Sequence, residues 1–396
     1  MSDAADKALL PAGLCDVLPP QAAFEDRTTE RLLAAFEAHG YERVKPPLIE
    51  FEESLLSGSG AALANHVFRL MDPQSHRMMG VRPDMTTQVA RIAATRLSGR
   101  PRPLRLSYGG EVLRVAGSQL RPERQFGQVG AELIGSDSAA GDAEVILMAV
   151  EALTDLGVRD LSVDLALPTL VPAILDGLDL NADNQERLRL ALDHKDIAEI
   201  HAMAPDIGTQ RADLIRALIA ATGSAGPAMA ALAALPLSGA AAAARDTLAR
   251  VLSLVTAGAP DLRLTIDLVE KWGFAYYTGV AFTLFSRGVR GELGRGGRYD
   301  TGHGMAADPA PESALETATG LTLFTDSLMR ALPADAPARR IFLPSGTDRA
   351  AARALRDAGW ITVAGLDDTP TPDAEAKRLG CGHVLDAAGP RDRKDQ

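Results

Sequence analysis

The side chains that could do chemistry begin with an alternating run in residues 106–135. This stretch reads as two strands joined by a polar loop. In the second strand a period of two places Gln128, Gly130 and Glu132 on one face. An amide and a carboxylate beside a glycine could bind a cationic amine, because glycine lets a ligand approach the backbone. The structural alternative is a solvated strand face, since polar alternation is common in antiparallel sheets.

The composition indicates a globular protein of two or three domains. Of the 396 residues, 46% are hydrophobic and 23% are charged, which argues against disorder. The net charge of −11 disfavours nonspecific nucleic-acid binding. Cys15 and Cys381 lie far apart and the seven histidines do not cluster, so we expect no metal site and a reduced, cytoplasmic setting. The first residues lack a secretion signal and no segment suits a bilayer, so we expect no membrane partner.

Hydrophobic periodicity predicts an α+β core with an insertion and a separate C-terminal unit. Within a core over residues 1–330, the expected elements are helices over about residues 21–39, 84–97 and 320–332, and strands over 41–51, 106–135, 262–270 and 279–286. Residues 181–259 are helical in pattern and rich in alanine and leucine, which predicts an inserted helical subdomain. Residues 339–396 alternate strand and helix, which predicts a small α/β unit. Ten basic and ten acidic residues balance between 335 and 396, whereas a surface that grips tRNA would be more basic.

Five short motifs follow one another along these elements. They read RPDMT, SYGGEVLR, RQFGQVGAE, YYTG and GGRYD. Together they resemble the catalytic core of histidyl-tRNA synthetase, a class II aminoacyl-tRNA synthetase, over about residues 10–330. The resemblance implies a six-stranded antiparallel sheet flanked by helices, which in the synthetase holds histidine and ATP. It also implies a dimer interface formed by the helix before Gly40 and a strand that contains Pro46 and Pro47.

The resemblance assigns a site for the amino group of histidine. Asp84 and Thr86 match the positions that contact this group, and Gln128 and Glu132 would complete the cage. An ammonium group has three donors and a full charge, so two carboxylates and an amide can satisfy it.

The remaining matched positions concern the imidazole and the carboxylate. Tyr277 and Tyr299 match hydroxyls that face the imidazole, and Tyr276 lies beside them. Aromatic packing in the core is the alternative role of these tyrosines. Arg114 matches the arginine that in the synthetase bridges the amino-acid carboxylate and the α-phosphate of ATP.

The chain departs from the synthetase where ATP should bind. Trp272 and Ala275 replace the catalytic arginine and aspartate, and Ala116 replaces an acidic residue. Ser327 stands where an ATP-binding arginine is expected, and Phe324 where a glycine is expected. Loss of one positioned donor typically costs about 10²–10³ in rate. We therefore expect no catalytic residues and no cofactor in this chain.

A synthetase core that keeps the histidine pocket but loses the ATP arginines resembles the regulatory subunits of ATP phosphoribosyltransferase. In that family the subunit does no chemistry. It forms a homodimer within a hetero-oligomer, together with a short-form ATP phosphoribosyltransferase catalytic subunit. There it enables the first step of histidine biosynthesis and mediates feedback inhibition by L-histidine. A working histidyl-tRNA synthetase and a stand-alone amino-acid sensor are the alternatives. Whether histidine occupies the pocket or a subunit boundary stays open.

Overall fold

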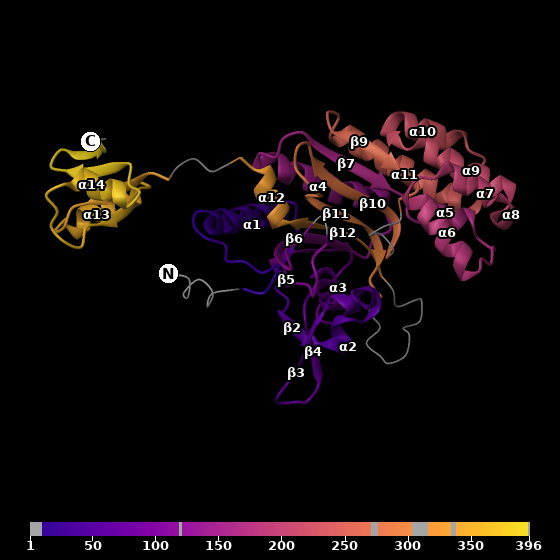
Figure 1. The fold of residues 1–396 in the computed structure, drawn as a ribbon, viewed down its shortest axis with the longest axis horizontal. Helices are drawn as coiled ribbons and strands as arrows, with labels where there is room; N and C mark the ends of the chain where they lie inside the picture. The colour runs from indigo at the N-terminus through magenta and orange to yellow at the C-terminus, as the bar shows by residue number, and fades with distance from the viewer. Residues whose placement is uncertain (1–9, 119–120, 271–275, 303–315, 334–337, 395–396) are drawn as a thin grey trace. The chain divides into compact units, whose positions relative to one another are not determined.

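A computed structural model describes residues 10–118, 121–270, 276–302, 316–333 and 338–394. The chain divides into two compact units, Met1–Leu332 and Pro333–Gln396 (Figure 1). The candidate functional side chains lie in the larger unit, so its sheet and the helices that cover it determine their positions.

A nine-stranded mixed sheet forms the centre of the larger unit (Figure 1). In sheet order the strands are β1 (Glu42–Arg43), β5 (Leu104–Leu113), β6 (Gln125–Ile134), β12 (Thr317–Phe324), β11 (Gly294–Asp300), β10 (Tyr277–Ser286), β7 (Leu161–Ala166), β9 (Arg263–Asp267) and β8 (Gly223–Ser224). The six consecutive strands from β5 to β7 are antiparallel, as the sequence predicts. Strands β1 and β9 add parallel pairs at the two sides, and β8 pairs with β9, so the α+β sheet is wider than expected.

Helices cover both faces of the sheet at β6. The covering helices are α1 (Gln21–Ala38), α3 (Thr86–Thr95), α4 (Ala139–Leu156) and α12 (Thr325–Ala331). Successive side chains of a strand point to opposite faces. Accordingly, Val129 and Leu133 of β6 join the core that contains α1 and α4, whereas Phe126 and Ile134 join a second core with α3. Because β6 is buried on both sides, the polar side chains on its α3 face are buried as well.

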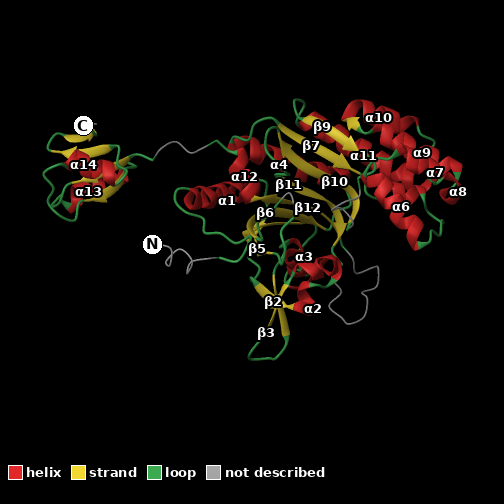
Figure 2. Cartoon of the chain, viewed as in Figure 1, coloured by secondary structure: helices red, strands yellow, loops and turns green. Residues whose placement is uncertain are grey.

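The helical insertion is present, with one short strand inside it. Its helices are α6 (Ala182–Asp193), α7 (Ile197–Ala202), α8 (Ala204–Ile207), α9 (Thr209–Ala221), α10 (Ala225–Ala234) and α11 (Gly239–Gly258), and α5 (Leu170–Ile174) precedes them. Figure 2 shows the helices of the insertion gathered at the end of the sheet that carries β8 and β9. Strand β8 lies between α9 and α10 and has only two residues, too few to show strand periodicity.

The expected strand over residues 41–51 is in fact two strands in different sheets. β1 joins the large sheet, whereas β2 (Ile49–Phe51) forms a small sheet with β4 (Met78–Val81) and β3 (Phe68–Met71). The short helices α2 (Glu52–Leu55) and η2 (Gly58–His66) follow β2. Pro46 and Pro47 lie between β1 and β2 rather than in a strand, because proline has no N–H to donate to a ladder.

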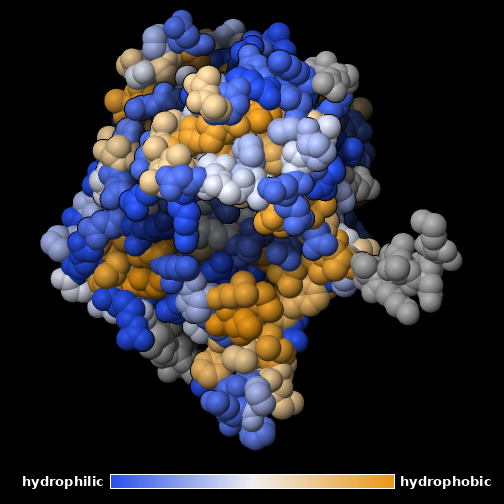
Figure 3. Space-filling view, turned by 90° about the vertical axis from the view of Figure 1, so that its left-hand side faces the viewer, coloured by the Kyte–Doolittle hydropathy of each residue, from blue (hydrophilic) through white to orange (hydrophobic). Residues whose placement is uncertain are grey.

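Apolar side chains are exposed on and beside the small sheet. Leu48, Ile49, Met71 and Met78 are each at least 38% exposed. Figure 3 shows apolar surface on the lower part of the face it draws, at the height of this sheet. Exposed apolar patches of this kind are typical of interaction surfaces.

The expected helix over residues 320–332 is also wrong in its first part. Residues 320–324 belong to β12, which pairs with β6 on one side and β11 on the other, and the helix begins only at Thr325. A central strand buried on both faces is a continuous apolar run. Periodicity alone does not distinguish such a run from a buried helix.

The C-terminal unit contains the predicted alternation of strands and helices. Its elements are β13 (Arg340–Leu343), α13 (Arg349–Asp357), β14 (Ile361–Ala364), α14 (Pro372–Arg378), β15 (His383–Asp386) and β16 (Gly389–Asp392). The strand order is β14-β13-β15-β16, and β16 adds an antiparallel edge that the sequence did not indicate. In both units, the helices among the described residues are too short or too polar to cross a membrane.

Candidate functional site

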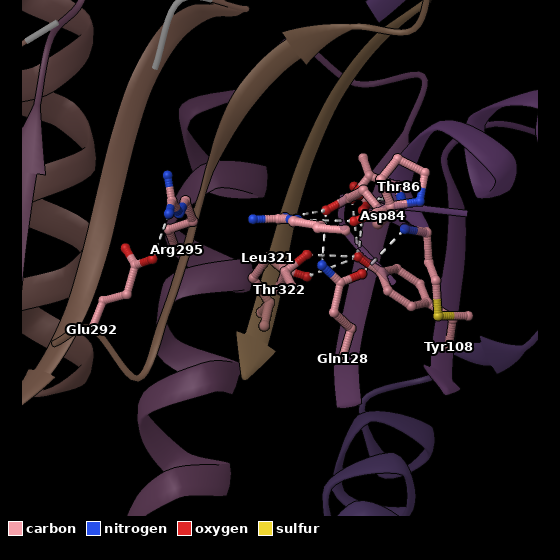
Figure 4. A network of polar contacts seen from close by, with 12 residues as sticks. Asp84, Thr86, Tyr108, Gln128, Glu292, Arg295, Leu321 and Thr322 are labelled. Carbon is pink, nitrogen blue, oxygen red and sulfur yellow. Dashed lines mark hydrogen bonds and ion pairs between the residues drawn. The ribbon is translucent and has the colours of Figure 1, made fainter. Parts of the chain in front are cut away.

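The centre of the candidate site is the polar face of β6 (Figure 4). Gln128 and Glu132 on this face are 0% and 1% exposed. Glu132 lies opposite Gly320 of β12. A Cβ atom added at Gly320 would run into the Glu132 carboxylate, so the glycine provides the room for that side chain. Backbone pairing and a missing side chain thus place a carboxyl group inside the protein.

The carboxyl group of Glu132 accepts hydrogen bonds from two tyrosines. The Tyr299 hydroxyl lies 2.9 Å from Oε2, and the Tyr108 hydroxyl lies 3.2 Å from Oε1. Burial raises the pKa of Glu132 to about 8, although these hydrogen bonds act in the opposite direction. At pH 7 the carboxyl group is therefore mostly protonated, and a ligand with a positive charge or several N–H donors would favour its ionised form.

Tyr108 is a member of this network that the sequence reasoning missed. Its hydroxyl lies 2.8 Å from Thr322 Oγ1 and 3.1 Å from Thr86 Oγ1. Its ring covers Gly130, where an added Cβ would collide with the ring. Gly130 therefore accommodates a tyrosine and does not leave backbone open to a ligand, contrary to expectation. The pairing of Tyr108 with Gly130 in the β5–β6 register is the signal that could have revealed this contact.

Asp84 joins the start of α3 to β6. Its Oδ1 accepts the backbone N–H of Thr86 at 2.8 Å, and its Oδ2 accepts Gln128 Nε2 at 2.8 Å. Gln128 Oε1 in turn accepts the backbone N–H of Met85 at 3.1 Å. The amide therefore locks the loop before α3 onto the sheet, and Asp84, Thr86 and Gln128 come together as the sequence predicts.

Arg114 approaches the same carboxylate from the end of β5. Its Nη2 atom is 3.8 Å from Asp84 Oδ2, which is a long ion pair, and its Nε donates to the Pro83 carbonyl at 3.2 Å. Burial lowers the pKa of Arg114, and Asp84 partly offsets this effect. The guanidinium group is thus near the cage but is not bound bidentately by it.

The three predicted tyrosines lie together: Tyr277 begins β10, Tyr276 directly precedes it, and Tyr299 is on β11. Tyr277 pairs with Tyr299 across the two strands, and the rings of Tyr276 and Tyr277 stack with centroids 4.1 Å apart. The Tyr276 ring also meets that of Tyr299 edge-on at 6.1 Å. Burial raises the pKa of the Tyr277 hydroxyl, which keeps it protonated and able to donate. Aromatic packing and hydrogen bonding are compatible roles here, because the rings contact one another while the Tyr299 hydroxyl donates to Glu132.

A buried ion pair anchors β11 behind the tyrosines. Arg298 points to the face opposite Tyr299, because successive residues of a strand alternate. Its Nη2 lies 2.8 Å from Asp142 Oδ1 in the first turn of α4, and its Nη1 donates to the Ser136 carbonyl at 2.9 Å. These bonds hold β11, and with it Tyr299, against α4.

The structure describes some of the positions at which the synthetase has ATP-binding residues. Trp272 and Ala275 lie outside the described residues, and Ala116 is exposed in the loop after β5. Ser327 is buried, and its hydroxyl accepts hydrogen bonds from Arg121 at 3.3 Å and from Arg330 at 3.0 Å. The site of the missing arginine is therefore surrounded by the chain's own guanidinium groups.

Phe324 fills the neighbouring space. Its ring contacts that of Phe126 edge-on, with centroids 5.9 Å apart. The guanidinium of Arg121 lies 3.7 Å from the centre of the Phe324 ring, and its Nε is 3.2 Å from Asp326 Oδ2. Arg121, which the sequence reasoning did not single out, is thus stacked and ion-paired within the protein.

A metal centre has no support in the described ranges. There, the His, Cys, Asp and Glu side chains form no group of three or more that could hold a metal ion. The site is an array of hydrogen-bond donors and acceptors that can bind a small polar molecule.

Known proteins resemble the chain in both sequence and structure. The family model described as histidyl-tRNA synthetase matches residues 13–328. A relative named ATP phosphoribosyltransferase regulatory subunit, from Paramagnetospirillum magneticum, is 57% identical, covering 98% of the chain and 99% of the relative. A relative of the same name from Rhodospirillum centenum is 55% identical, and the match covers 95% of the chain and 94% of that relative.

Among solved structures, a Bacillus halodurans protein shares the fold. Its structure, described as an ATP phosphoribosyltransferase regulatory subunit/histidyl-tRNA synthetase, superposes with a TM-score of 0.78 at 25% identity. The match covers 93% of the chain and 96% of that structure, so the large sheet with its flanking helices is the class II synthetase architecture.

Proposed function

The chain belongs to the family of ATP phosphoribosyltransferase regulatory subunits, and on that premise we propose that it activates a short-form catalytic subunit and makes it sensitive to histidine. In this proposal the chain does no chemistry, and the glycosyltransferase reaction that begins histidine biosynthesis takes place in the partner. The observation that carries the proposal is the buried carboxyl group of Glu132, held among hydroxyl groups beside the Asp84–Gln128 pair.

This arrangement suits a free amino acid. Asp84, Thr86 and Gln128 offer acceptors for an ammonium group, which requires up to three. Glu132 supplies a second negative charge once it loses its proton, and Tyr277 and Tyr299 border the same space. Histidine carries both an ammonium group and an imidazole, and it can thus use both ends of this polar array.

Inhibition by histidine requires a difference between two arrangements of the complex. A ligand shifts such an equilibrium only by binding one arrangement more tightly than the other. The polar network includes residues of β6 and β12, and α12 follows β12 directly and packs on α1 and β6. A change at the pocket therefore has a short packed route to α1, which the family resemblance places at the dimer interface.

The exposed apolar residues of the small sheet support a homodimer within the complex. Leu48 and Ile49 directly follow the two prolines that the resemblance places at the dimer interface, and Met71 and Met78 lie on the neighbouring strands. A two-fold symmetric interface uses the same patch on both copies. A single dimer contact would therefore bury these apolar residues on both chains.

The test is phosphoribosyl-ATP formation by the catalytic subunit alone, with this chain, and with a Glu132→Gln variant, each across a histidine series. We expect the chain to raise the rate and histidine to lower it. The variant should activate normally but need about 10–100-fold more histidine, because a charged hydrogen bond is worth about 1.5–3 kcal/mol.

Glu186→Gln is the matched control, because Glu186 lies on α6 of the helical insertion with a side chain that is 56% exposed. It should change neither activation nor inhibition. The assignment is wrong if the wild-type chain alters neither the rate of the catalytic subunit nor its response to histidine.

Tyr277→Phe should have a smaller effect on histidine binding than Glu132→Gln. It removes a neutral hydroxyl, which is worth about 0.5–1.5 kcal/mol, and keeps the ring stacked on Tyr276. Calorimetric titration should show affinity lower by about 2–10-fold with an unchanged melting temperature. If Tyr277→Phe lost as much histidine affinity as Glu132→Gln, the charge of the carboxylate would not make its contact stronger than that of the tyrosine hydroxyl.

A further inference from the structure

Arg295 lies on the ligand-facing side of the sheet, next to the network around Glu132. It is four residues before Tyr299 on β11, and the strand period of two puts both side chains on one face. Its direct partner on β12 is Thr322, the hydroxyl of which contacts Tyr108. Directly opposed residues of antiparallel strands have Cβ atoms about 4.5–5.5 Å apart. Figure 4 shows Arg295 and Glu292 across Thr322 from Gln128 and Asp84.

The guanidinium of Arg295 is only partly engaged. Its Nη2 forms an ion pair with Glu292. Its Nε is buried and has no hydrogen-bond partner within the part of the chain that the structure describes. A buried donor without a partner is costly, and such groups in folded proteins usually mark a ligand or water site.

Three guanidinium groups gather around the ring pair of Phe126 and Phe324. Arg114 lies 5.1 Å from the centre of the first ring, and Arg295 lies 5.8 Å from the centre of the second. Arg121 lies 4.9 Å and 3.7 Å from the two centres, which themselves are 5.9 Å apart. Positive charge is therefore concentrated directly beside the amino-acid cage.

The three arginines differ in how far the protein neutralises them. Arg121 is ion-paired with Asp326 at 3.2 Å and donates to Ser327. Arg114 has a long, 3.8 Å contact to Asp84, a carboxylate that already accepts two shorter hydrogen bonds, and it donates to the neutral Pro83 carbonyl at 3.2 Å. Besides burial, the positive charges of Arg295 and Arg121 lower the pKa of Arg114. An anion between Arg114 and Arg295 would relieve this repulsion.

We propose that Arg295 joins Arg114, which the resemblance already matches to a carboxylate-binding arginine of the synthetase, in an anion subsite that binds the carboxylate of the amino acid whose ammonium group lies at Asp84 and Gln128. This proposal rests on the proposed function, because it names the contacts of the same ligand. The synthetase has arginines at the positions of Trp272 and Ser327. In this chain Arg295 of β11 would supply a positive charge instead. Glu292 neutralises Arg295 while the subsite is empty and competes with the ligand for it.

The test is calorimetric titration of the full chain with histidine and with histidinol, the alcohol analogue that lacks the carboxylate. The wild-type chain should prefer histidine. Arg295→Gln should weaken histidine binding by about 10–100-fold but change histidinol binding by less than about threefold. Arg295→Lys, which keeps the charge, should retain most of the affinity. Glu292→Gln should tighten histidine binding, since it removes the competing carboxylate.

Arg287→Gln is the matched control, because Arg287 is exposed on the same β10–β11 hairpin. It should leave both affinities unchanged. Equal losses for histidine and histidinol in Arg295→Gln would show a structural role and overturn the proposal, as would a wild-type chain that binds the two ligands equally well.

Titration with inorganic phosphate separates this proposal from the proposed function. If the wild-type chain binds neither histidine nor histidinol, the proposed function fails. Phosphate binding that depends on Arg295 would then mean that the subsite takes a free phosphate, which overturns the carboxylate assignment. No phosphate binding would overturn the subsite itself. Histidine binding that depends on Arg295 and is weakened by phosphate supports the proposal.

Discussion

Strands β6 and β12 build two different environments at their two ends. At one end Glu132 lies opposite Gly320, and the glycine leaves room for a buried carboxyl group with its tyrosine partners. At the other end Gln128 lies opposite Phe324, and the phenyl ring with Arg121 occupies the adjoining space. One end is a buried network of polar side chains, and the other is packed by an aromatic ring and internally ion-paired.

The two ends differ in what fills the space beside the strands. At the first end buried polar groups are stable because they hydrogen-bond to one another. In contrast, Ser327 and Asp326 already satisfy Arg121, and Phe324 occupies volume. We therefore expect the first end, and not the second, to take part in ligand binding.

The largest expected effect concerns the missing ATP-binding cations. We predict that the chain forms histidyl-adenylate slower than a working synthetase by about 10⁴–10⁶, since two positioned cations are missing and each is worth about 10²–10³. Histidine-dependent exchange between pyrophosphate and ATP measures this rate. A turnover of about 1 per second or more, which is ordinary for an enzyme, would contradict the comparison.

A second prediction separates the two ends by mutation. Phe324→Ala should destabilise the larger unit by about 3–5 kcal/mol, because it opens a cavity between Phe126 and Arg121. Affinity of the folded variant for histidinol, which lacks the carboxylate that Arg114 and Arg295 would bind, should stay within about threefold of the wild type, which is less than the effect of one hydrogen bond. Denaturant unfolding and calorimetric titration test the two parts. A parallel fall in affinity would show that the two ends are not independent.

The smallest expected effect is the proton linked to Glu132. With a pKa of about 8, this group is mostly protonated at pH 7, and it should ionise when a cationic ligand binds. Histidine binding at pH 7 should thus release most of one proton per chain, and none in Glu132→Gln. Calorimetry in buffers with different ionisation enthalpies measures this release. A binding heat that does not depend on the buffer would show that histidine binding releases no proton from Glu132.

The same shift determines how stability depends on pH without a ligand. The folded chain holds a proton on Glu132 that the unfolded chain releases above a pKa of about 4.5. The contribution of Glu132 to stability therefore falls as the pH rises from about 4.5 to about 8. Melting temperatures should consequently decline less over this range in Glu132→Gln than in the wild type.

Sequence reasoning identified most of the candidate site because the relevant signals are local. The strand period places Gln128 and Glu132 on one face, and the motif order places Asp84 and Thr86 at the start of a helix. Tyr108 was missed because its partners come from other segments, and Arg295 because only its pairing with Thr322 of β12 places it beside the network. The Tyr108 hydroxyl meets Thr322, which is 214 residues away in the sequence. Residues 320–324 were assigned to a helix because a doubly buried strand has no polar period.

The sequence by itself determined which side chains could bind an amino acid, and the tertiary structure decided how they behave. Residue types and a period of two depend only on the chain within a few positions. The charge state of Glu132 depends instead on its burial between β5 and β12 and on hydroxyls from Tyr108 and Tyr299. Such burial arises only when segments far apart in the sequence pack together, because desolvation is a property of the assembled core.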